Sequence, residues 1–508
     1  MSWLLVLPVA LPFAAAIAAF LLRERTAGRW VSILGSAALL VVSGLLMVEV
    51  LAHDVVAAQM GGWPAPFGIT LVADRLSAVM VLITAVVALA VSVYALADIE
   101  ERLERLGYHA LFQVLIAGVN GAFVTGDLFN LYVWFEVMLI ASFGLLVLGG
   151  SREQIDGGVK YVALNLIATI LFLTGIGLLY GTTGTLNMAD LSRAVEDVHP
   201  GLLTAIAMLF LIAFGMKAAV FPLFFWLPAA YHTPAFSVSA VFAGLLTKVG
   251  VYALLRCFTL IFDHDVGYTH EILLWVAGLT MVTGVLGAAA QTDIRRILSF
   301  HIVSQIGYMV LGLALYTPLA LVGAVFYLVH HIVVKANLFL VAGAVQRLAG
   351  GTELTRIGGL YRSAPLLAAL FLVPAFSLAG FPPLSGFWAK FVLVRAALED
   401  GGWVIAAAAL LVGLMTIYSM TKIWAAAFWA PHPDGREPAL STLTPLQRRG
   451  FLLPIAGLAA LTLVIGLAPE PFVTFAEDAA AGLLDPSAYV AAVLGEAPVA
   501  LSALEGTR

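Results

Sequence analysis

The sequence predicts an all-α membrane protein with about fourteen transmembrane helices, and three observations lead to this prediction. Of its 508 residues, 62% are hydrophobic and only 11% are charged, and the mean hydropathy is +1.03. A soluble globular protein has roughly 45–50% apolar and about 25% charged residues, so a soluble fold of this length could not cover its apolar surface. The apolar runs are about 20 residues long, which is typical of membrane-spanning helices and not of the alternating strands of a barrel.

Turn residues and charges divide the chain into the expected spans. The run that ends near residue 398 is too long for one simple crossing and is interrupted at Gly380-Phe-Pro-Pro383. The acidic segment after Pro469 is weakly amphipathic and fits either a surface helix or a disordered tail. The spans lie near residues 2–22, 30–51, 71–97, 109–126, 130–149, 161–180, 201–228, 238–260, 271–290, 297–316, 319–345, 365–398, 403–424 and 451–469.

Positive charge is distributed unevenly between the two sets of connections. The connections that follow the odd-numbered spans carry most of the lysines and arginines, whereas the opposite connections hold little beyond Arg75 and Arg193. By the positive-inside rule, both termini are therefore expected outside. The first positive cluster, Arg23, Arg25 and Arg29, follows an apolar run instead of preceding it, which is the reverse of a secretory signal.

The stretch 214–256 contains two lysines, Lys217 and Lys248, within runs apolar enough to lie in lipid. A lysine at the bilayer centre costs about 2.5–3.5 kcal/mol on insertion scales, so two such residues indicate a function. Prolines between them would break a continuous helix. These prolines are Pro222, Pro228 and Pro234.

A second proline-broken segment echoes the first. The segment Phe221-Pro-Leu-Phe-Phe-Trp226 has a counterpart in Phe381-Pro-Pro-Leu-Ser-Gly-Phe-Trp388, where Pro382 and Pro383 are adjacent. Lys217 precedes the first break and Lys390 follows the second. Paired broken spans favour inverted repeats with functional sites at the breaks, although Phe-Pro pairs are common in membrane chains and leave the repeat open.

Glu136 lies about six residues inside its expected span, too deep for solvent, and therefore needs a cationic partner. An ion pair with Lys217 would lower the cost of burying both groups. Burial lowers the proton affinity of a lysine and a nearby carboxylate raises it, so a lysine whose partner moves can act as a proton switch. Asp127, in the preceding turn, is expected to be a loop or N-cap residue.

Further ionisable residues extend this set. His330 and His331 precede Lys335 in one span, and His331 and Lys335 share a helix face at spacing i,i+4. A lone buried histidine more often satisfies a hydrogen bond, but histidines near intramembrane lysines titrate near physiological pH and suit proton hopping. No metal-ligand array, nucleophile–base motif or cofactor fingerprint is recognisable, and Cys257 is the single cysteine. The predicted proton relay consists of Glu136, Lys217, Lys248, His330, His331, Lys335 and Lys390.

Five segments, in this order over roughly residues 70–420, resemble the antiporter-like subunits shared by Mrp-type cation/proton antiporters and respiratory complex I. The resemblance implies two inverted five-helix repeats with broken helices seven and twelve. Helices 1–3 would occupy residues 1–105, the repeats 106–262 and 263–430, and the last helix with the tail 431–508. The segments are GDLFNLYVWFEVMLI, FFWLPAAYHTPAFSVSA, AAAQTDIRRILSFHIVSQIGYM, HHIVVKANLFLVAGA and GFPPLSGFWAKF.

The resemblance also assigns positions to the relay. It places Glu136 on helix five, Lys217 on helix seven and Lys248 on helix eight. His330 or His331, with Lys335, would belong to helix eleven, and Lys390 would be the terminal residue on helix twelve. A glutamate in place of Lys390 would instead resemble one complex I subunit. The segment LFNLYVWFE and the chain length are most similar to the D-type subunits of Mrp antiporters. A departure is YHTPAF, where many relatives read AHxxAP, and it leaves His232 without an assigned role.

The resemblance implies a proton-translocating subunit of a multi-subunit Na⁺/proton antiporter, a transporter component and not an enzyme. Its partners would be other subunits of a hetero-oligomeric complex in the plasma membrane of a prokaryote, membrane lipid, protons and Na⁺, with no cofactor, metal or nucleic acid. The alternative is a proton-pumping membrane subunit of a complex I-type NADH dehydrogenase or a membrane-bound hydrogenase. A non-conducting scaffold is disfavoured, because a scaffold would gain stability by losing its intramembrane charges.

Overall fold

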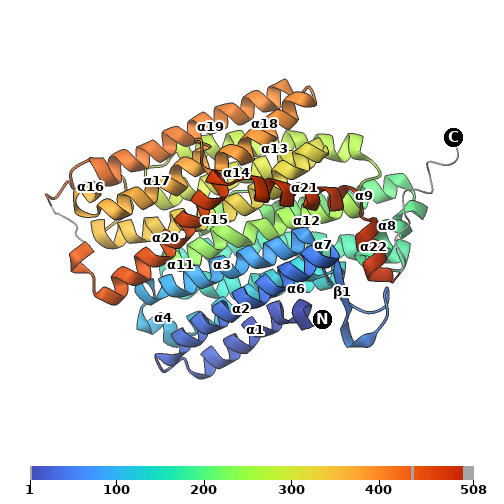
Figure 1. Ribbon diagram of the computed structural model, residues 1–508, viewed down its shortest axis with the longest axis horizontal. Coiled ribbons are helices and arrows are strands. Elements are labelled where there is room, and N and C mark those ends of the chain that lie inside the picture. The colour runs from blue at the N-terminus through green and yellow to red at the C-terminus, as the bar shows by residue number, and fades with distance from the viewer. Residues whose placement is uncertain (1–2, 436–439, 496–508) are drawn as a thin grey trace.

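Long helices lying side by side form the body of the protein, as Figure 1 shows for the computed structural model, which describes residues 3–435 and 440–495. By length and composition, twelve of the described helices can cross a membrane, and two shorter apolar helices, α5 (Tyr108–Val124) and α17 (Pro365–Ala379), accompany them. The chain is thus a helical multi-pass membrane protein, as predicted, and the total of fourteen crossings stays a prediction. The twelve are α1 (Trp3–Leu21), α2 (Ala27–His53), α3 (Arg75–Asp98), α6 (Leu128–Val147), α7 (Arg152–Thr183), α9 (Pro200–Ala218), the continuous unit Phe236–Leu260, α13 (Val266–Ala290), α14 (Ile294–Leu315), α15 (Pro318–Ala349), the unit Trp403–Trp429 and α20 (Pro445–Leu467).

Two of these units contain a π-helical turn. The unit Phe236–Leu260 consists of α11 (Phe236–Val241), the π-helical η3 (Phe242–Leu246) and α12 (Thr247–Leu260). The unit Trp403–Trp429 consists of α19 (Trp403–Trp424) and the π-helical η4 (Ala425–Trp429). The remaining described elements are α4 (Glu101–Arg105), α8 (Met188–Ala194), α10 (Trp226–Ala230), α16 (Leu360–Ser363), α18 (Ser385–Glu399), α21 (Glu470–Leu484), α22 (Ser487–Leu494), the antiparallel strands β1 (Val56–Gln59) and β2 (Thr70–Ala73), and the 3-10 turns η1 (Met60–Gly62), η2 (Val195–Asp197) and η5 (Leu440–Thr442).

Local sequence sets several helix boundaries. The carboxylate of Asp127 accepts a hydrogen bond from the backbone N–H of Asn130 at 2.7 Å and caps the first turn of α6, which confirms the expected N-cap. Ser151 and Gln154 form a reciprocal capping box at the start of α7. At the other end of α7, Gly184 has φ +74°, a conformation that glycine adopts without a steric penalty.

Two interruptions break the helical order at the expected positions. Helix α9 ends at Ala218, residues 219–225 are irregular, and α10 begins at Trp226. The second interruption, 380–384, separates α17 from α18. Pro222 lies in the first interruption, and Pro382 and Pro383 lie in the second.

Pro228 does not break a helix, contrary to the expectation from sequence. It lies in the first turn of α10, where a backbone N–H has no intrahelical partner in any case. The interruption that follows α9 is therefore set by residues before Pro228. In particular, Ala219 terminates α9 in the left-handed conformation, with φ 64°.

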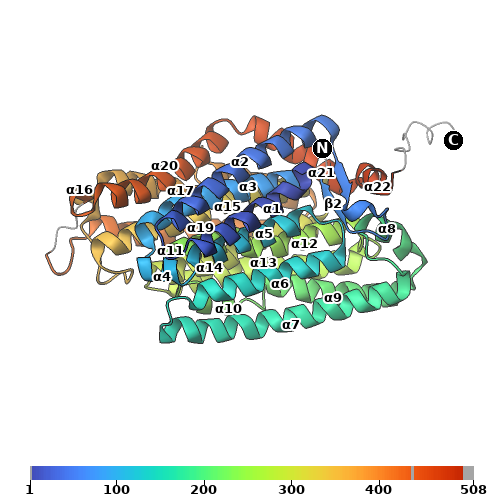
Figure 2. The same cartoon turned by 90° about the horizontal axis from the view of Figure 1, so that it is seen from below.

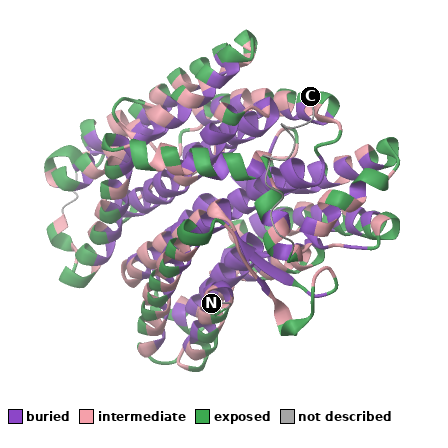
Figure 3. Ribbon diagram, turned by 45° about the vertical axis from the view of Figure 1, so that its right-hand side comes forward, coloured by how far each residue is buried: buried purple, intermediate pink, exposed green. Residues whose placement is uncertain are grey.

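Burial separates the helices into a central and a peripheral set, shown in purple and in pink and green in Figure 3. The unit Phe236–Leu260, α14 and α15 are almost entirely buried, whereas α1, α2 and α7 bury only part of their surface. Figure 2 shows α7 and α9 side by side along one edge of the molecule. Most of the predicted relay residues therefore lie on helices that the rest of the chain shields from lipid.

The segment after Pro469 is helical through residue 494, which resolves the alternative left open by the sequence for the described residues. Helix α21 packs against α15, α3 and α12. Asp478 on α21 forms an ion pair with Arg75 at the start of α3. Gln59 of β1 donates a hydrogen bond to the carbonyl oxygen of Val493 at 3.0 Å, so α22 is also fastened to the body.

Candidate functional site

A threonine lies between the first two predicted relay residues. The hydroxyl of Thr169 on α7 donates a hydrogen bond to Oε1 of Glu136 on α6 at 2.6 Å. The Lys217 ammonium, near the end of α9, donates to the same hydroxyl oxygen at 3.4 Å. For these two residues, both within the described chain, the direct ion pair expected from sequence is not present; the charges are joined through Thr169.

The surroundings of Lys217 combine aromatic rings with a small cavity. The ammonium lies 5.5 Å from the centre of the Phe135 ring, a cation–π distance. A cavity of about 20 Å³ adjoins Lys217 and is lined in part by Tyr161, Asn165 and Tyr231. This volume is about enough for one water molecule. The hydroxyl of Tyr231 is buried and has no protein partner among the described residues, which makes the cavity polar enough to hold water.

Lys248 occupies a wholly buried position at the start of α12. Its ammonium donates a hydrogen bond to the carbonyl oxygen of Ala243, in the π-helical turn η3. A π-helical turn displaces the regular i→i−4 hydrogen-bond pattern, and such turns are frequent at functional sites. The local backbone geometry thus supplies the acceptor that an isolated buried ammonium needs.

Close backbone approach brings the Lys217 and Lys248 regions together. A Cβ atom at Gly250 would lie 2.6 Å from the backbone nitrogen of Ala218 and 2.9 Å from the carbonyl carbon of Lys217. Only glycine permits this contact between α12 and the end of α9. Gly250 lies two residues after Lys248. The close contact at Gly250 therefore holds the end of α9, which carries Lys217, against the segment of α12 that carries Lys248.

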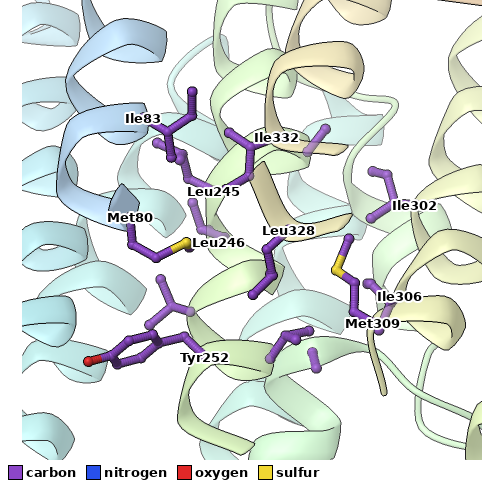
Figure 4. Packing of buried hydrophobic residues seen from close by; sticks show 14 of the residues in the cluster. Met80, Ile83, Leu245, Leu246, Tyr252, Ile302, Ile306, Met309, Leu328 and Ile332 are labelled. Carbon is purple, nitrogen blue, oxygen red and sulfur yellow. The ribbon is translucent and has the colours of Figure 1, made fainter. Parts of the chain in front are cut away.

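Apolar side chains fill the space around the segment 245–252, as Figure 4 shows. They come from α3, α14 and α15 as well as from η3 and α12. Except for the Tyr252 hydroxyl, which donates to the carbonyl oxygen of Phe123, these side chains offer no hydrogen bonds, so a charge in this region depends on the few polar groups present. The labelled residues are Met80, Ile83, Leu245, Leu246, Tyr252, Ile302, Ile306, Met309, Leu328 and Ile332.

Helix α15 contributes His330, His331 and Lys335, all wholly buried. A Cβ at Gly244 of η3 would lie 3.5 Å from Cβ of Ala336, so η3 packs directly against this part of α15. Lys335 directly precedes Ala336 and Lys248 follows Gly244 by four residues, so this contact brings the segments that carry the two lysines together. Neither the Lys335 ammonium nor either ring nitrogen of His331 has a hydrogen-bond partner in the described part of the chain.

Lys390 lies on α18, just after the second interruption. Its ammonium donates to the carbonyl oxygens of Leu378 and Ala379 at 2.9 and 3.1 Å. These carbonyls belong to the last turn of α17, where intrahelical partners are lacking. The ammonium also lies 5.0 Å from the centre of the Tyr308 ring. The end of α17 at the second interruption thus supplies the carbonyl acceptors for the Lys390 ammonium. The π-helical turn η3 supplies the acceptor for the Lys248 ammonium in the same way.

Two serines that the sequence analysis did not single out lie between His330 and this interruption. Nδ1 of His330 is 2.8 Å from the hydroxyl of Ser385, and that hydroxyl is 2.9 Å from the hydroxyl of Ser377. Both serines are buried. The Ser377 hydroxyl also accepts a hydrogen bond from the N–H of Gly386 at 3.1 Å.

Helix α14 presents a polar face that was also missed. His301, Gln305 and Tyr308 recur at i, i+4 and i+7 and are all buried. The Tyr327 hydroxyl of α15 donates to Oε1 of Gln305, and the rings of Tyr327 and Tyr308 stack with centres 5.2 Å apart. The signal in the sequence was the helical spacing of polar residues within an apolar run.

Open pockets lie at the helix ends. One, of about 530 Å³, is lined by His232, Arg295 and Glu353 among others. Nδ1 of His232 donates a hydrogen bond to the carbonyl oxygen of Pro228 at 2.8 Å. A second pocket, of about 330 Å³, adjoins Arg75 and Asp478 at the end that carries α22. Within residues 3–435 and 440–495, no cluster of three or more His, Cys, Asp or Glu side chains could hold a metal ion.

Glu104 forms a separate charged cluster outside the relay. It binds Nη2 of Arg29 at 2.7 Å and lies 3.3 Å from Nε2 of His109. Burial alone would raise the pKa of Glu104, but the hydrogen bond with His109 and the charge of Arg29 outweigh this effect and hold the pKa below 4.5. This cluster ties α2 to α4 and α5.

Comparisons with known proteins agree with this architecture. A family described as "NADH:quinone oxidoreductase/Mrp antiporter, TM" matches residues 125–416. The D subunit of the Na(+)/H(+) antiporter of Alkalihalophilus pseudofirmus is 47% identical over 98% of this chain and 100% of that protein. A chain of the Mrp complex from Dietzia sp. DQ12-45-1b superposes with a TM-score of 0.89 at 35% identity, covering 97% of this chain and 100% of that one. A chain of respiratory complex I from Thermus thermophilus has a TM-score of 0.80 at 26% identity, covering 94% and 99%.

Proposed function

The chain belongs to the NADH:quinone oxidoreductase/Mrp antiporter family of membrane subunits, and from this premise we propose that it is the proton-translocating subunit of a multi-subunit Na⁺/proton antiporter. The observation that carries the proposal is the set of buried lysines, Lys217, Lys248, Lys335 and Lys390, on four different helices. Each would cost about 2.5–3.5 kcal/mol near the bilayer centre, and in the described chain the hydrogen-bond partners of Lys217, Lys248 and Lys390 are neutral groups while Lys335 has none. A protein with no use for these lysines would be more stable without them, whereas a proton path needs groups that can bind and release protons.

The first step is a switch at Glu136 and Lys217. A carboxylate near an ammonium lowers the free energy of the charged lysine, and withdrawal of that carboxylate favours release of the proton. Thr169 hydrogen-bonds both groups, so a small movement of either changes their separation. The cavity beside Lys217 provides room for a water molecule that can carry the released proton.

The proton then passes through Lys248 to the α15 residues and on to Lys390. The packing of η3 against α15 brings the segments that carry Lys248 and Lys335 together, and a proton on one lysine disfavours a proton on a neighbouring lysine. His331 and His330 supply ring nitrogens between them and the second interruption. Lys390, held by two backbone carbonyls, is the last group of the line. Movement in either direction is compatible with this order.

We also propose the plasma membrane of a prokaryote as the location, with both termini outside. The start of α1 and α22 lie at the same end of the bundle, with β1 and α8, and α4 and α16 lie at the opposite end (Figure 1). The arginine-rich connections fall at the α4 and α16 end, which would face the cytoplasm. The partners would be the other subunits of the antiporter and the surrounding lipid.

Alanine variants of Glu136, Lys217, Lys248 and Lys390 test the proposal. Each would be expressed with the partner subunits in cells lacking other antiporters, and Na⁺-driven proton movement would be measured in everted vesicles. Loss of exchange with normal assembly is expected for all four. Lys160→Ala is the matched control, because Lys160 is exposed and its ion-pair partner among the described residues is the exposed Asp156. Normal exchange in all four variants would exclude the proposal.

The likeness to complex I favours one second candidate, a proton-pumping subunit of a redox enzyme. The two candidates differ in their source of free energy. An antiporter subunit exchanges Na⁺ for protons in vesicles that receive no electron donor. If proton movement instead required NADH or reduced ferredoxin and ignored Na⁺, the second candidate would replace the first.

A further inference from the structure

Ser377 and Ser385 lie on either side of the second interruption; their hydroxyls are hydrogen-bonded to each other, and that of Ser385 is also hydrogen-bonded to His330. Ser385 begins α18 and Ser377 lies in the last turn of α17, so their hydroxyls meet across the break at 2.9 Å. Ser385 is also 2.8 Å from Nδ1 of His330, on a third helix. The next two residues after Ser377 supply the carbonyls that bind Lys390. Two hydrogen-bonded hydroxyls thus lead from His330 to the last turn of α17, whose carbonyls bind Lys390.

We propose that Ser385 and Ser377 form a hydroxyl bridge that carries protons between His330 and Lys390, an inference that rests on the proposed function. A hydroxyl can donate one hydrogen bond while accepting others, so a row of hydroxyls can pass a proton without holding charge. Direct contact between the imidazole and the ammonium is then unnecessary.

Each hydroxyl of the bridge gains one proton and loses one during the transfer, so neither ends charged. A proton arrives at Nε2 of His330, and the proton on Nδ1 moves to the Ser385 oxygen. Ser385 gives its original proton to the Ser377 oxygen, and Ser377 gives its own, through a water molecule in the interruption, to the neutral amine of Lys390. Rotation of the two hydroxyls, together with a flip of the His330 ring that returns an N–H to the Ser385 oxygen, resets the bridge, and the reverse sequence carries a proton the other way.

Because these residues are buried, a proton cannot reach Lys390 from His330 through bulk water. His330 and Ser377 are wholly inaccessible to solvent and Ser385 nearly so. Nε2 of His330 has no partner within the described chain, which leaves it available for the incoming proton. A Cβ at Gly386 would lie 1.8 Å from the carbonyl oxygen of Ser377 and 2.9 Å from the His330 ring, so this glycine lets the three elements approach.

A structural role for the serines predicts a different result from a conducting role. Ser377 accepts a hydrogen bond from the Gly386 N–H, so its removal would also disturb the start of α18. Ser385 makes no such backbone contact among the described bonds, and Ser385→Ala is therefore the cleaner variant. Ser36→Ala is the matched control, because Ser36 and Ser92 form a second buried hydroxyl pair, 3.0 Å apart, between α2 and α3.

The test measures Na⁺-driven proton exchange in everted vesicles, in H₂O and in D₂O, for the complete complex. Ser385→Ala should lower the maximal rate by at least about tenfold, leave the Na⁺ concentration for half-maximal rate unchanged, and increase the H₂O/D₂O rate ratio. Ser385→Thr, which keeps the hydroxyl, should recover the isotope ratio of the parent, and Ser36→Ala should match the parent throughout. An unchanged rate, or a lower rate with an unchanged isotope ratio, overturns the proposal, since loss of folded complex lowers the rate without altering that ratio.

Lys390→Ala, measured in parallel, separates this inference from the proposed function. If Lys390→Ala is inactive and Ser385→Ala is normal, only the hydroxyl bridge fails. If Lys390→Ala exchanges normally, the relay itself fails.

Discussion

Replacing Thr169 with valine tests the first step of the relay with little change in shape. Valine keeps the branched form of threonine and removes only the hydroxyl that joins Glu136 to Lys217. The bond to Glu136, at 2.6 Å, has the short length of a charge-assisted hydrogen bond. Such bonds contribute about 1.5–3 kcal/mol, and each 1.36 kcal/mol corresponds to a tenfold change in rate. Thr169→Val should therefore slow exchange by roughly 10- to 100-fold.

The assay is Na⁺-driven proton movement in everted vesicles containing the whole complex, with the amount of complex measured in each preparation. Thr174→Val is a matched control on the same helix, because Thr174 is exposed and its hydroxyl donates only to the carbonyl of Ile170. Thr169→Ser should keep most of the activity, since serine retains the donor. If Thr169→Val exchanges at the parental rate, the bridge has no role and Glu136 must act without it.

The remaining predictions concern stability. Gly386→Ala should prevent stable assembly or destabilise the folded protein by at least about 1–3 kcal/mol, because the new Cβ would overlap a backbone carbonyl. Gly457→Ala is the control, because the space around Gly457 is open and the change should be neutral or slightly stabilising. Thermal denaturation in detergent distinguishes the two variants. Asp478→Ala removes a half-exposed partner of Arg75, so it should cost under about 1 kcal/mol and appear chiefly as faster hydrogen exchange in α21, with transport intact. Because the pKa of Glu104 is lowered in the folded protein, its carboxylate stabilises the fold above pH 4.5, and this contribution disappears as the pH falls below that value. Glu104→Gln should therefore lower Tm near pH 7 but have the parental Tm once the parent carboxylate is protonated. An equal difference in Tm at every pH would contradict this prediction.

The arrangement of helices was predictable because lipid imposes strong constraints on sequence. Apolar length places most spans within a few residues, and the two interruptions follow from proline and glycine at 222 and at 380–383. Asp127 was predictable as a cap because an aspartate before an apolar run is a recurring start signal. The buried lysines stood out because charge within lipid-length runs is rare.

The groups that connect the lysines were harder to foresee. A threonine inside a transmembrane helix usually bonds to a carbonyl one turn back, as Thr174 does, and the sequence does not distinguish Thr169 from it. The π-helical turn that supplies an acceptor to Lys248 leaves no mark in the hydrophobic pattern. From the sequence alone, serines next to helix ends are expected to be helix caps. Only the structure shows that α15, which carries His330, lies beside Ser385. Each of these contacts depends on which helices are neighbours.

An indirect link between Glu136 and Lys217 is better suited to a switch than a direct ion pair. The two bonds that share the Thr169 hydroxyl measure 2.6 and 3.4 Å, so the charges lie at most about 6 Å apart. At an effective dielectric constant of about 20, unit charges attract by about 6 kcal/mol at the roughly 2.8 Å of a direct contact and by about 3 kcal/mol at 6 Å. The bridged arrangement therefore holds the charged lysine about 3 kcal/mol less strongly than a direct contact would. A buried pair in direct contact is costly to separate, and it would hold the proton on the lysine. A neutral hydroxyl between the charges keeps them coupled while leaving the proton free to move.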